Sequence, residues 1–584
     1  MRTILFATMT ALAVTGSAPA PFTAPAPAQP AAERRGSDPD RICARYLDED
    51  SSDYQMRSRV GLSGGVMPSR NVMPSPPSPP PPPTHSAQFA QERAVTGGRI
   101  ARPTPYPQPR PDPRDRERYD GEEVAAVRAV ADEPVSTFGV DIDTGSYANV
   151  RRFLNDNRMP PQAAVRTEEM LNYFRYDYPR PEDRSRPFSV SADMTTTPWN
   201  PESRLLRVGL RGYDVAARER PAANLVFLVD VSGSMFSRDK LPLVKCSLAL
   251  VAEQMNPRDR VSIVVYSGAA GRVLDPTGDP RRVVEALGRL QAGGSTAGAQ
   301  GMTLAYRTAR ENMIEGGINR VIMATDGDFN VGLSNNEAII DMVERERRTG
   351  VQLTALGFGT GNYNEAMMEQ VANKGNGNYA YIDSPREAQK VLSQELSSTL
   401  FTIAQDVKIQ VEFNPAQVAE YRLIGYENRA LREEDFANDA VDAGDIGAGH
   451  QVTALYEIVP AGGRGWMPDR RYEGNRRPAP PAQAGEMAHL RLRYKLPGQN
   501  ESRLIEQPLS AGAIRAAQAP RGDTAFAVAV AAYGQLLRGD TNMGRFSFAD
   551  VRALAQRANL SDWWRREFVQ LTQSAEAGGA RASR

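Results

Sequence analysis

The chain has 584 residues, more than one hydrophobic core normally serves, so its length predicts two or three domains. It contains 70 lysine and arginine residues and 70 aspartate and glutamate residues, and this balance gives no electrostatic argument for a nucleic-acid partner. The only cysteines are Cys43 and Cys246. We expect no disulfide framework, with Cys246 acting as a small buried apolar residue in a helix.

The first residues have the order of a secretory signal peptide. Met1 and Arg2 precede an apolar run from Ile4 to Val14, and an Ala-Pro-Ala series follows. We assign residues 1–28 to the signal peptide and expect export to the periplasm, the cell envelope or the medium; an uncleaved tail on a cytosolic protein is the alternative. The run is shorter than the roughly 20 residues that span a bilayer, and no later segment approaches that length. No cysteine directly follows the run, which disfavours a lipid anchor.

Residues 29–133 have the composition of a spacer. They are rich in proline, serine, alanine and arginine, and include an unbroken run from Pro79 to Pro83. Such sequence favours solvated polyproline II because it has few large apolar side chains to offset the entropy lost on ordering. We predict a disordered spacer, with a ligand for a proline-recognising domain as the alternative.

Ordered structure is expected from Pro134. Residues 134–215 form an N-terminal region that we associate with the domain after it. Its predicted elements are a strand at 136–143, helices at 147–157 and 165–173, and strands at 188–194 and 205–211.

Residues 221–402 alternate short apolar runs with helical patterns. Such alternation predicts a parallel sheet covered by helices on both faces, the doubly wound α/β (Rossmann-like) class. The segment Gly271 to Leu274 is expected to be an antiparallel edge strand, and Tyr379 to Ile382 the opposite edge. The other expected strands are 225–229, 261–266, 321–324 and 351–358, with helices near 240–255, 298–314, 335–348 and 364–373.

After residue 402 the pattern changes to alternation of polar and apolar residues. This predicts a β-sandwich-like domain over 403–520, in which each strand has one buried and one solvated face. Helical periodicity returns in a C-terminal segment over 521–576, and residues 577–584 are expected to be a disordered tail. The expected strands are 407–413, 452–458 and 490–494, and the expected helices are 524–537 and 548–573.

Small oxygen ligands gather on three loops of the α/β domain. Asp230, Ser232 and Ser234 follow its first strand, Asp326 ends the fourth, and Thr296 lies in a glycine-rich loop before a helix. In a doubly wound sheet these loops meet beyond the carboxyl ends of the strands. Hydroxyl and carboxylate oxygens without histidine or cysteine suit Mg²⁺ or Mn²⁺. We expect a divalent cation there, with one coordination position left for an external carboxylate.

These residues match the DxSxS, loop-threonine and strand-end TDG signature, and the domain therefore resembles von Willebrand factor type A (vWA) domains. The resemblance implies a metal-ion-dependent adhesion site (MIDAS) and a six-stranded sheet of order 3-2-1-4-5-6. It also implies water-mediated contacts from the two aspartates and direct contacts from Ser232, Ser234 and Thr296. Ser295 is the alternative loop ligand, but the spacing of Thr296 to Gly301 fits the family better.

Outside this domain the chain resembles a bacterial family of exported vWA proteins from Ser136 to Ala575. The flanking regions of that family have no assigned chemistry. If the strands before Gly212 and after Gln405 pair into one β-sandwich, the vWA domain is an insertion, a layout similar to vertebrate inter-alpha-trypsin inhibitor heavy chains. The matching segments are 136–153, 166–174, 421–429 and 441–450.

Two motifs imitate enzyme sites. Asp143-Thr-Gly-Ser146 is similar to half of an aspartic protease site, but that chemistry needs a second carboxylate motif and the sequence has none. Asp141 and Asp143 imitate a phosphatase nucleophile motif, which requires a parallel sheet to follow it. We interpret the segment as a capped turn. Three histidines support neither a Ser-His-Asp triad nor a histidine-rich metal site, and Lys240 is not taken as a base for Ser234.

The sequence therefore predicts a non-enzymatic, exported module that engages a protein carboxylate through Mg²⁺ or Mn²⁺. The alternative is an envelope scaffold whose flanking domains make the contacts and whose metal is structural. No nucleic-acid partner and no transmembrane segment are expected, and the pattern specifies no oligomeric state.

Overall fold

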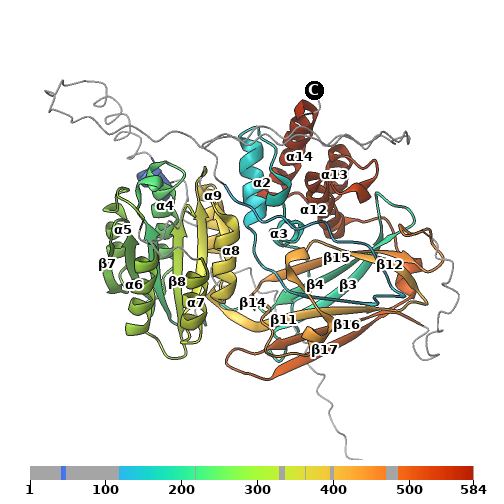
Figure 1. Cartoon of the computed structure of the whole chain (residues 1–584), viewed down its shortest axis with the longest axis horizontal. Helices are drawn as coiled ribbons and strands as arrows, with labels where there is room; N and C mark the ends of the chain where they lie inside the picture. Colours follow the sequence, from blue (N-terminus) through green and yellow to red (C-terminus); the bar gives the residue numbers. More distant parts are fainter. Residues whose placement is uncertain are drawn as a thin grey trace, which may run out of the picture. The chain divides into compact units, whose positions relative to one another are not determined.

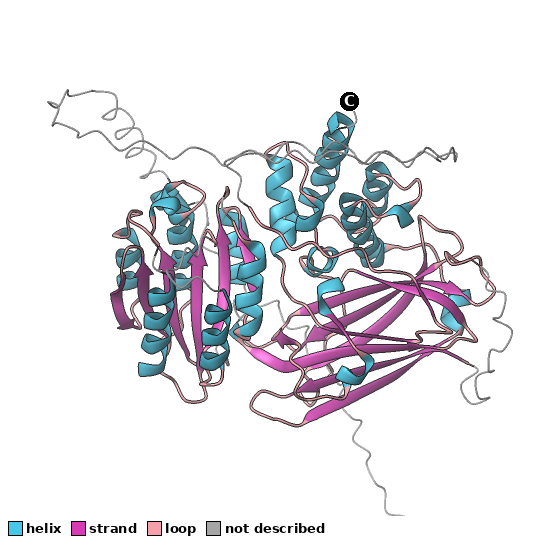
Figure 2. Cartoon of the chain, in the orientation of Figure 1, coloured by secondary structure: helices cyan, strands magenta, loops and turns pink. Residues whose placement is uncertain are grey.

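The described part of the chain consists of an α/β domain, two packed β-sheets and a layer of helices (Figure 1 and Figure 2). The predicted signal peptide, most of the predicted spacer and the last two residues lie outside the described ranges. Within those ranges, no helix has both the length and the apolar content to cross a membrane. The computed structural model describes residues 41–47, 117–216, 219–296, 298–327, 336–361, 363–394, 400–468 and 485–582.

A six-stranded sheet of order β10-β9-β8-β5-β6-β7 forms the centre of the α/β domain. All its neighbouring strands are parallel except β7, which pairs antiparallel with β6 at one edge. Counted from the domain's first strand, the order from β7 to β10 is 3-2-1-4-5-6, which confirms the predicted topology and edge strand. The bounds are β5 Ala223–Asp230, β6 Arg260–Tyr266, β7 Ala270–Thr277, β8 Ile318–Thr325, β9 Gln352–Phe358 and β10 Tyr379–Ile382.

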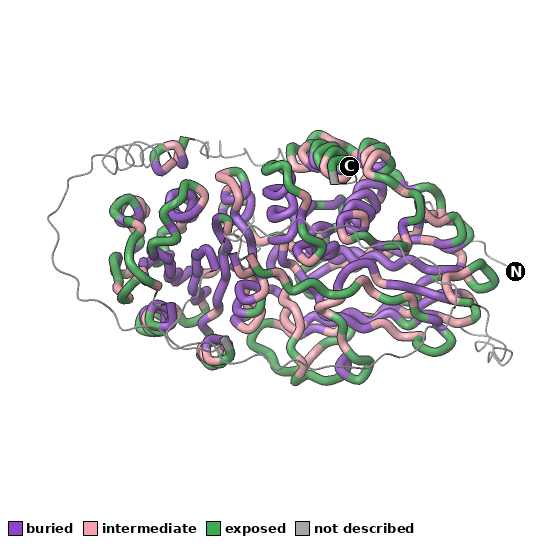
Figure 3. The backbone as a smooth tube through the Cα atoms, turned by 45° about the horizontal axis from the view of Figure 1, so that its top comes forward, coloured by how far each residue is buried: buried purple, intermediate pink, exposed green. Residues whose placement is uncertain are grey.

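Helices cover both faces of this sheet. Leu225 and Phe227 of β5 pack towards α4, α5 and α9, whereas Val226 and Leu228 pack towards α6, α7 and α8. Every residue of β5 is buried, as expected for a strand covered on both sides (Figure 3). The bounds are α4 Leu241–Glu253, α5 Pro280–Gly288, α6 Gly298–Glu311, α7 Asn336–Arg347, α8 Glu365–Lys374, α9 Pro385–Gln389 and the π-helix η3 Lys390–Gln394.

The regions that flank the α/β domain form two sheets with a shared apolar core. One sheet has the order β1-β12-β15-β4-β3, and the other β13-β2-β11-β16-β17 with β14 paired to β11. Phe138 of β2, Leu206 of β4 and Val411 of β11 meet in the core between them. The bounds are β1 Arg128–Ala129, β2 Val135–Gly139, β3 Phe188–Thr196, β4 Arg204–Gly212, β11 Thr402–Phe413, β12 Val418–Ile424, β13 Ala430–Leu431, β14 Gly444–Gly447, β15 Gln451–Pro460, β16 Glu486–Lys495 and β17 Ser502–Ser510.

Strands that precede the α/β domain in the sequence pair with strands that follow it. β4 pairs antiparallel with β15, and β2 pairs antiparallel with β11. The α/β domain is therefore inserted between β4 and β11, which confirms the insertion hypothesis. The predicted division into a region at 134–215 and a domain at 403–520 is wrong, because both sheets draw strands from both ranges.

The helical layer packs on the outer face of the five-stranded sheet, against Leu205, Ile424 and Leu455. A single helix was expected at 548–573, but a break at 556–562 separates two helices. The predicted disordered tail is also wrong up to Ala582, where the last helix ends. The bounds are α2 Gly145–Asn155, α3 Thr167–Asn172, α12 Gly522–Arg538, α13 Phe548–Ala555 and α14 Trp563–Ala582. The short helix α11 Gly512–Ala516 instead places Ile514 in the core between the two sheets.

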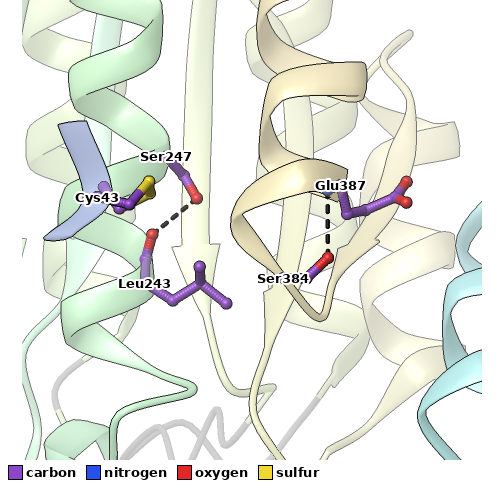
Figure 4. Close-up of a disulfide and its surroundings, with 6 residues drawn as sticks. Cys43, Leu243, Ser247, Ser384 and Glu387 are labelled. Carbon is purple, nitrogen blue, oxygen red and sulfur yellow. Dashed lines mark hydrogen bonds between the residues drawn. A yellow bond between two sulfur atoms is a disulfide. The ribbon is translucent and has the colours of Figure 1, made fainter. Parts of the chain in front are cut away.

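The two cysteines are bonded to each other. Cys43, in a helical segment at residues 41–47, forms a disulfide with Cys246 of α4 (Figure 4). Cys43 and Tyr46 are buried in the core on the α4 side of the sheet, and the Tyr46 hydroxyl donates to the Val284 carbonyl at 3.4 Å. The expectation of no disulfide was therefore wrong. Cys246 is buried as predicted, but it is a cross-link.

The predicted disordered spacer is also wrong at both its described parts. Residues 41–47 are helical, and ordered backbone begins again before Pro134. Arg118 forms a β-bridge with Asn364, and β1 pairs with β12. A short helix is marginal in isolation. Here the disulfide and the apolar surface of the α/β domain stabilise the helical segment at residues 41–47.

Candidate metal site

The candidate metal site lies where β5 and β8 end side by side. Asp230 is the last residue of β5, and Asp326 directly follows the neighbouring parallel strand β8. Both carboxylates are fully buried, Ser232 is buried, and Ser234 is exposed in the short 3-10 helix η2 Gly233–Phe236 that follows β5. The site therefore occupies the carboxyl edge of the sheet, as the sequence predicted.

Protein donors hold both carboxylate oxygens of Asp230. The Ser232 amide donates to Oδ1 at 2.8 Å, and the Thr325 hydroxyl donates to Oδ2 at 3.0 Å. The pKa of Asp230 is raised to about 6, chiefly by burial and also by the nearby Asp326 charge, while the hydrogen bonds from Ser232 and Thr325 oppose this rise. These two bonds fix the orientation of the carboxylate, and each oxygen keeps a lone pair that can accept from a metal-bound water.

The two serine hydroxyls have the spacing of neighbouring ligands on an octahedral ion. Ser232 Oγ and Ser234 Oγ lie 3.1 Å apart. Adjacent oxygens around Mg²⁺ are separated by about 3.0 Å when each metal–oxygen distance is about 2.1 Å. The two hydroxyls are within hydrogen-bonding distance of each other, and their separation is compatible with two neighbouring ligands of Mg²⁺ or Mn²⁺.

Backbone hydrogen bonds join the loop that carries Thr296 to the loop after β5. The Gly233 amide donates to the Gly294 carbonyl at 3.0 Å, and the Gly293 amide donates to the Val231 carbonyl at 2.8 Å. Gly294 has φ +83°, and a β-carbon there would lie 2.3 Å from Ser267 Oγ, so this turn requires glycine. Half-buried Thr296 follows two residues later, before α6.

Lys240 is a charged member of the site that sequence reasoning missed. Its Nζ lies 2.9 Å from Asp326 Oδ2, and its side chain is 8% exposed. The signal available in the sequence was a lysine at the start of the helix that follows the DxSxS loop. Sequence reasoning had considered this lysine only as a base for Ser234.

The donor set is poor in ionisable ligands. Within the described ranges, no group of three or more histidine, cysteine, aspartate or glutamate side chains is placed to hold a metal. The candidate site combines two carboxylates with hydroxyl groups, a set that suits a hard cation and fits zinc or copper poorly.

The Asp143-Thr-Gly-Ser146 segment forms a buried turn between β2 and α2. The Asp143 amide donates to Asp141 Oδ1 at 3.0 Å, the Tyr379 amide donates to Asp143 Oδ1 at 2.8 Å, and the Ser146 hydroxyl donates to a carbonyl. Arg429 Nη2 lies 3.2 Å from both aspartates. These contacts fit the predicted turn.

A polar pocket lies next to this turn. It has a volume of about 270 Å³, and its lining includes Asp141, Asp143, Asn378, Arg429 and Asp445. Asn378 directly precedes β10, so the pocket lies at the end of the parallel sheet opposite the metal site. Burial, together with the charges of neighbouring aspartates, raises the pKa of Asp445 to about 7.

Three family models match the chain. The model described as von Willebrand factor type A domain covers residues 224–394, and one described as von Willebrand factor covers 113–207. A third, described as uncharacterized protein YfbK, C-terminal, covers 398–577. Together with the sheet order, these matches define a vWA-domain protein.

The uncharacterized protein YfbK of Escherichia coli strain K12 is 44% identical over 469 residues, which is 79% of this chain and 81% of that protein. The chain belongs to the YfbK family. Human inter-alpha-trypsin inhibitor heavy chain H4 is 28% identical over 192 residues, covering 31% of this chain and 20% of that one. Among solved structures, von Willebrand factor type A from Catenulispora acidiphila is 14% identical, with a TM-score of 0.38, covering 68% of this chain and 91% of that chain.

Proposed function

We propose that this chain is an exported protein-binding module whose vWA domain engages a partner's carboxylate through Mg²⁺ or Mn²⁺. The observation that carries the proposal is the arrangement of Asp230, Ser232 and Ser234. The two hydroxyls have octahedral spacing, and the aspartate is held by other donors. When bound, the cation would supply a positive centre for an external carboxylate.

Each residue of the site has a distinct task in this proposal. Ser232, Ser234 and Thr296 would hold the cation directly, and Asp230 and Asp326 would hold it through water. Ser234 is exposed, so the side of the site next to it faces solvent and is open to a partner. The buried aspartates strengthen electrostatic attraction to the cation because little water screens them.

Metal titration tests the site itself. We expect Mg²⁺ or Mn²⁺ to bind the wild type in calorimetry and to raise its thermal unfolding temperature. Thr296→Ala and Asp230→Ala should weaken binding by about tenfold or more. Thr303→Ala removes a hydroxyl that donates to the Ala299 carbonyl on α6 and should leave metal affinity unchanged. Equal affinity in all four proteins would exclude this site.

Partner capture separates the binding module from the scaffold alternative. The full chain is used to capture proteins from an envelope extract in Mg²⁺, in chelator, and as Thr296→Ala. A carboxylate-dependent partner should be retained only by the wild type in Mg²⁺. A partner retained equally in every arm would show that the flanking sheets or helices make the contacts.

Export is supported by the disulfide. Cys43 and Cys246 are the only cysteines, and structural disulfides form chiefly in oxidising compartments. Thiol alkylation of cells before lysis tests this proposal. The expected result is a protein that reacts only after reduction and co-fractionates with a periplasmic marker. Two reactive thiols in a cytosolic fraction would contradict export.

A further inference from the structure

The Lys240 ammonium lies inside the candidate metal site. It is 2.9 Å from Asp326 Oδ2, and the two side chains are 8% and 0% exposed. Asp230, the other carboxylate, is also fully buried and lies near enough for the Asp326 charge to act on it. A positive charge held this close to a cation site must affect what the site binds.

The fold holds the lysine stem in place. Gly359, which follows β9, has φ +75°, and a β-carbon there would lie 2.2 Å from Lys240 Cγ. The Gly359 carbonyl in turn accepts a hydrogen bond from the Tyr381 hydroxyl at 2.8 Å. The backbone at Gly359 therefore leaves room for the aliphatic stem, and the ammonium position follows from packing.

We propose that Lys240 sets the charge of the metal site so that it accepts one carboxylate from a partner; this inference rests on the proposed function. Two ionised aspartates and a divalent cation have no net charge together. The ammonium adds one positive charge to these three groups. One external carboxylate then offsets that charge.

The same charge has opposite effects on the two ligands. It repels the incoming cation, so it weakens metal binding in the absence of a carboxylate. It attracts the carboxylate, so it strengthens partner binding to the loaded site. In a buried site both effects are large because uncompensated charge is costly there. Because the carboxylate would contact the cation, metal and carboxylate should bind cooperatively, and each should raise the affinity for the other by the same factor.

The test is a Mn²⁺ titration in chloride and in acetate at equal ionic strength, with acetate as the carboxylate probe. Acetate should raise the Mn²⁺ affinity of the wild type. Lys240→Met keeps the stem and removes the charge. It should bind Mn²⁺ in chloride on the order of tenfold more tightly, as expected when a like charge a few ångströms away is removed, and the same acetate concentration should raise its affinity less than that of the wild type.

Control variants separate charge from packing. Lys240→Arg keeps the charge and should keep the acetate effect. Lys374→Met removes a lysine of α8, which pairs with Glu344, and should behave as the wild type. If Lys240→Met does not fold, as judged by circular dichroism, Lys240→Gln replaces it in the same titrations. A merely structural lysine would weaken Mn²⁺ binding when replaced, the reverse of our expectation.

The outcomes distinguish this inference from the proposed function. Weaker or equal Mn²⁺ binding by Lys240→Met, or an acetate effect as large as that of the wild type, overturns the role of Lys240 and leaves the metal site standing. Binding by Lys240→Met but not by the wild type would uphold the effect of Lys240 on the cation and overturn the proposed function. No binding by either protein overturns both.

Discussion

Arg151 of α2 forms a bidentate ion pair with Asp383, which follows β10 of the α/β domain. The two hydrogen bonds are 2.7 Å from Nε to Oδ2 and 2.6 Å from Nη2 to Oδ1. The same guanidinium, 2% exposed, also lies 2.7 Å from Glu387 of α9 and 3.2 Å from Glu567 of α14. One arginine from the N-terminal region therefore contacts both the inserted domain and the C-terminal helices.

Replacement of Arg151 should strongly destabilise the chain. Arg151→Met leaves the carboxylates of Asp383 and Glu387 buried without this cation, so we expect the free energy of unfolding to fall by roughly 3–5 kcal/mol. Urea denaturation followed by circular dichroism measures the change. Arg180→Met, which breaks an exposed pair with Asp214, should alter it by less than about 1 kcal/mol. Equal midpoints for the two variants would contradict the role of Arg151.

Loss of the disulfide should also lower stability. The bridge joins residues separated by 203 positions, so it restricts the unfolded chain strongly. Replacing both Cys43 and Cys246 by alanine should reduce the free energy of unfolding by about 2–5 kcal/mol. A reductant should lower the urea midpoint of the wild type and leave that of the double variant unchanged. Thiol titration gives an independent check, because two free thiols in the unreduced native protein would exclude the bridge.

The contact between α8 and α2 should make stability depend on pH. Burial raises the pKa of Glu365 to about 7, Arg166 opposes this rise, and Glu369 adds to it. In the unfolded chain a glutamate titrates near pH 4.3. The folded state therefore binds its proton more tightly, and this contribution to stability is complete below about pH 4 and is lost as pH rises through about 7.

Glu365→Gln tests this contribution. The amide oxygen can still accept from Asn149, whose Nδ2 lies 3.1 Å from Glu365 Oε1. We expect the variant to be more stable than the wild type at pH 8 and its stability to fall less between pH 5 and 8. Glu168 has a pKa also raised to about 7 by burial, so part of the pH dependence should remain. Glu285→Gln, at an exposed position, should follow the wild-type curve, and a Glu365→Gln curve that did the same would refute the assignment.

The parallel strands of the α/β domain were predictable because most of their residues are apolar. A strand buried on both faces is a continuous apolar run, and such runs alternate with helices in only a few topologies. β17 was missed because it is an exposed edge strand and more than half of its residues are polar. The specific pairing of β2 with β11, more than 260 residues later, was not predicted; the sequence supported only the hypothesis that the two flanks form one β-sandwich, because local patterning does not specify such a distant partner.

Some residues of the candidate site could likewise be identified from the sequence and others could not. Asp230, Ser232 and Ser234 lie in one short motif, so the sequence specifies their proximity directly. The sequence did not identify Lys240 as a member of the site or Cys43 as part of a cross-link. Each of these roles depends on a partner far away in the sequence, Asp326 for Lys240 and Cys246 for Cys43. A composition rich in proline predicts disorder on average, and it does not reveal one short helix with a docking surface.

A matched pair of glycines tests whether the loop of Thr296 must hold its shape for the site to bind metal. Gly294→Ala places a β-carbon at φ +83° and 2.3 Å from Ser267 Oγ, whereas a β-carbon at Gly293 meets nothing within 4 Å. Because a left-handed conformation costs a non-glycine residue about 1–2 kcal/mol, we expect Gly294→Ala to lower the unfolding temperature. Displacement of the loop should also weaken Mn²⁺ binding, although no ligand has been removed. Gly293→Ala should change neither quantity, and equal Mn²⁺ affinities for the two variants would mean that the loop does not contribute to the metal site.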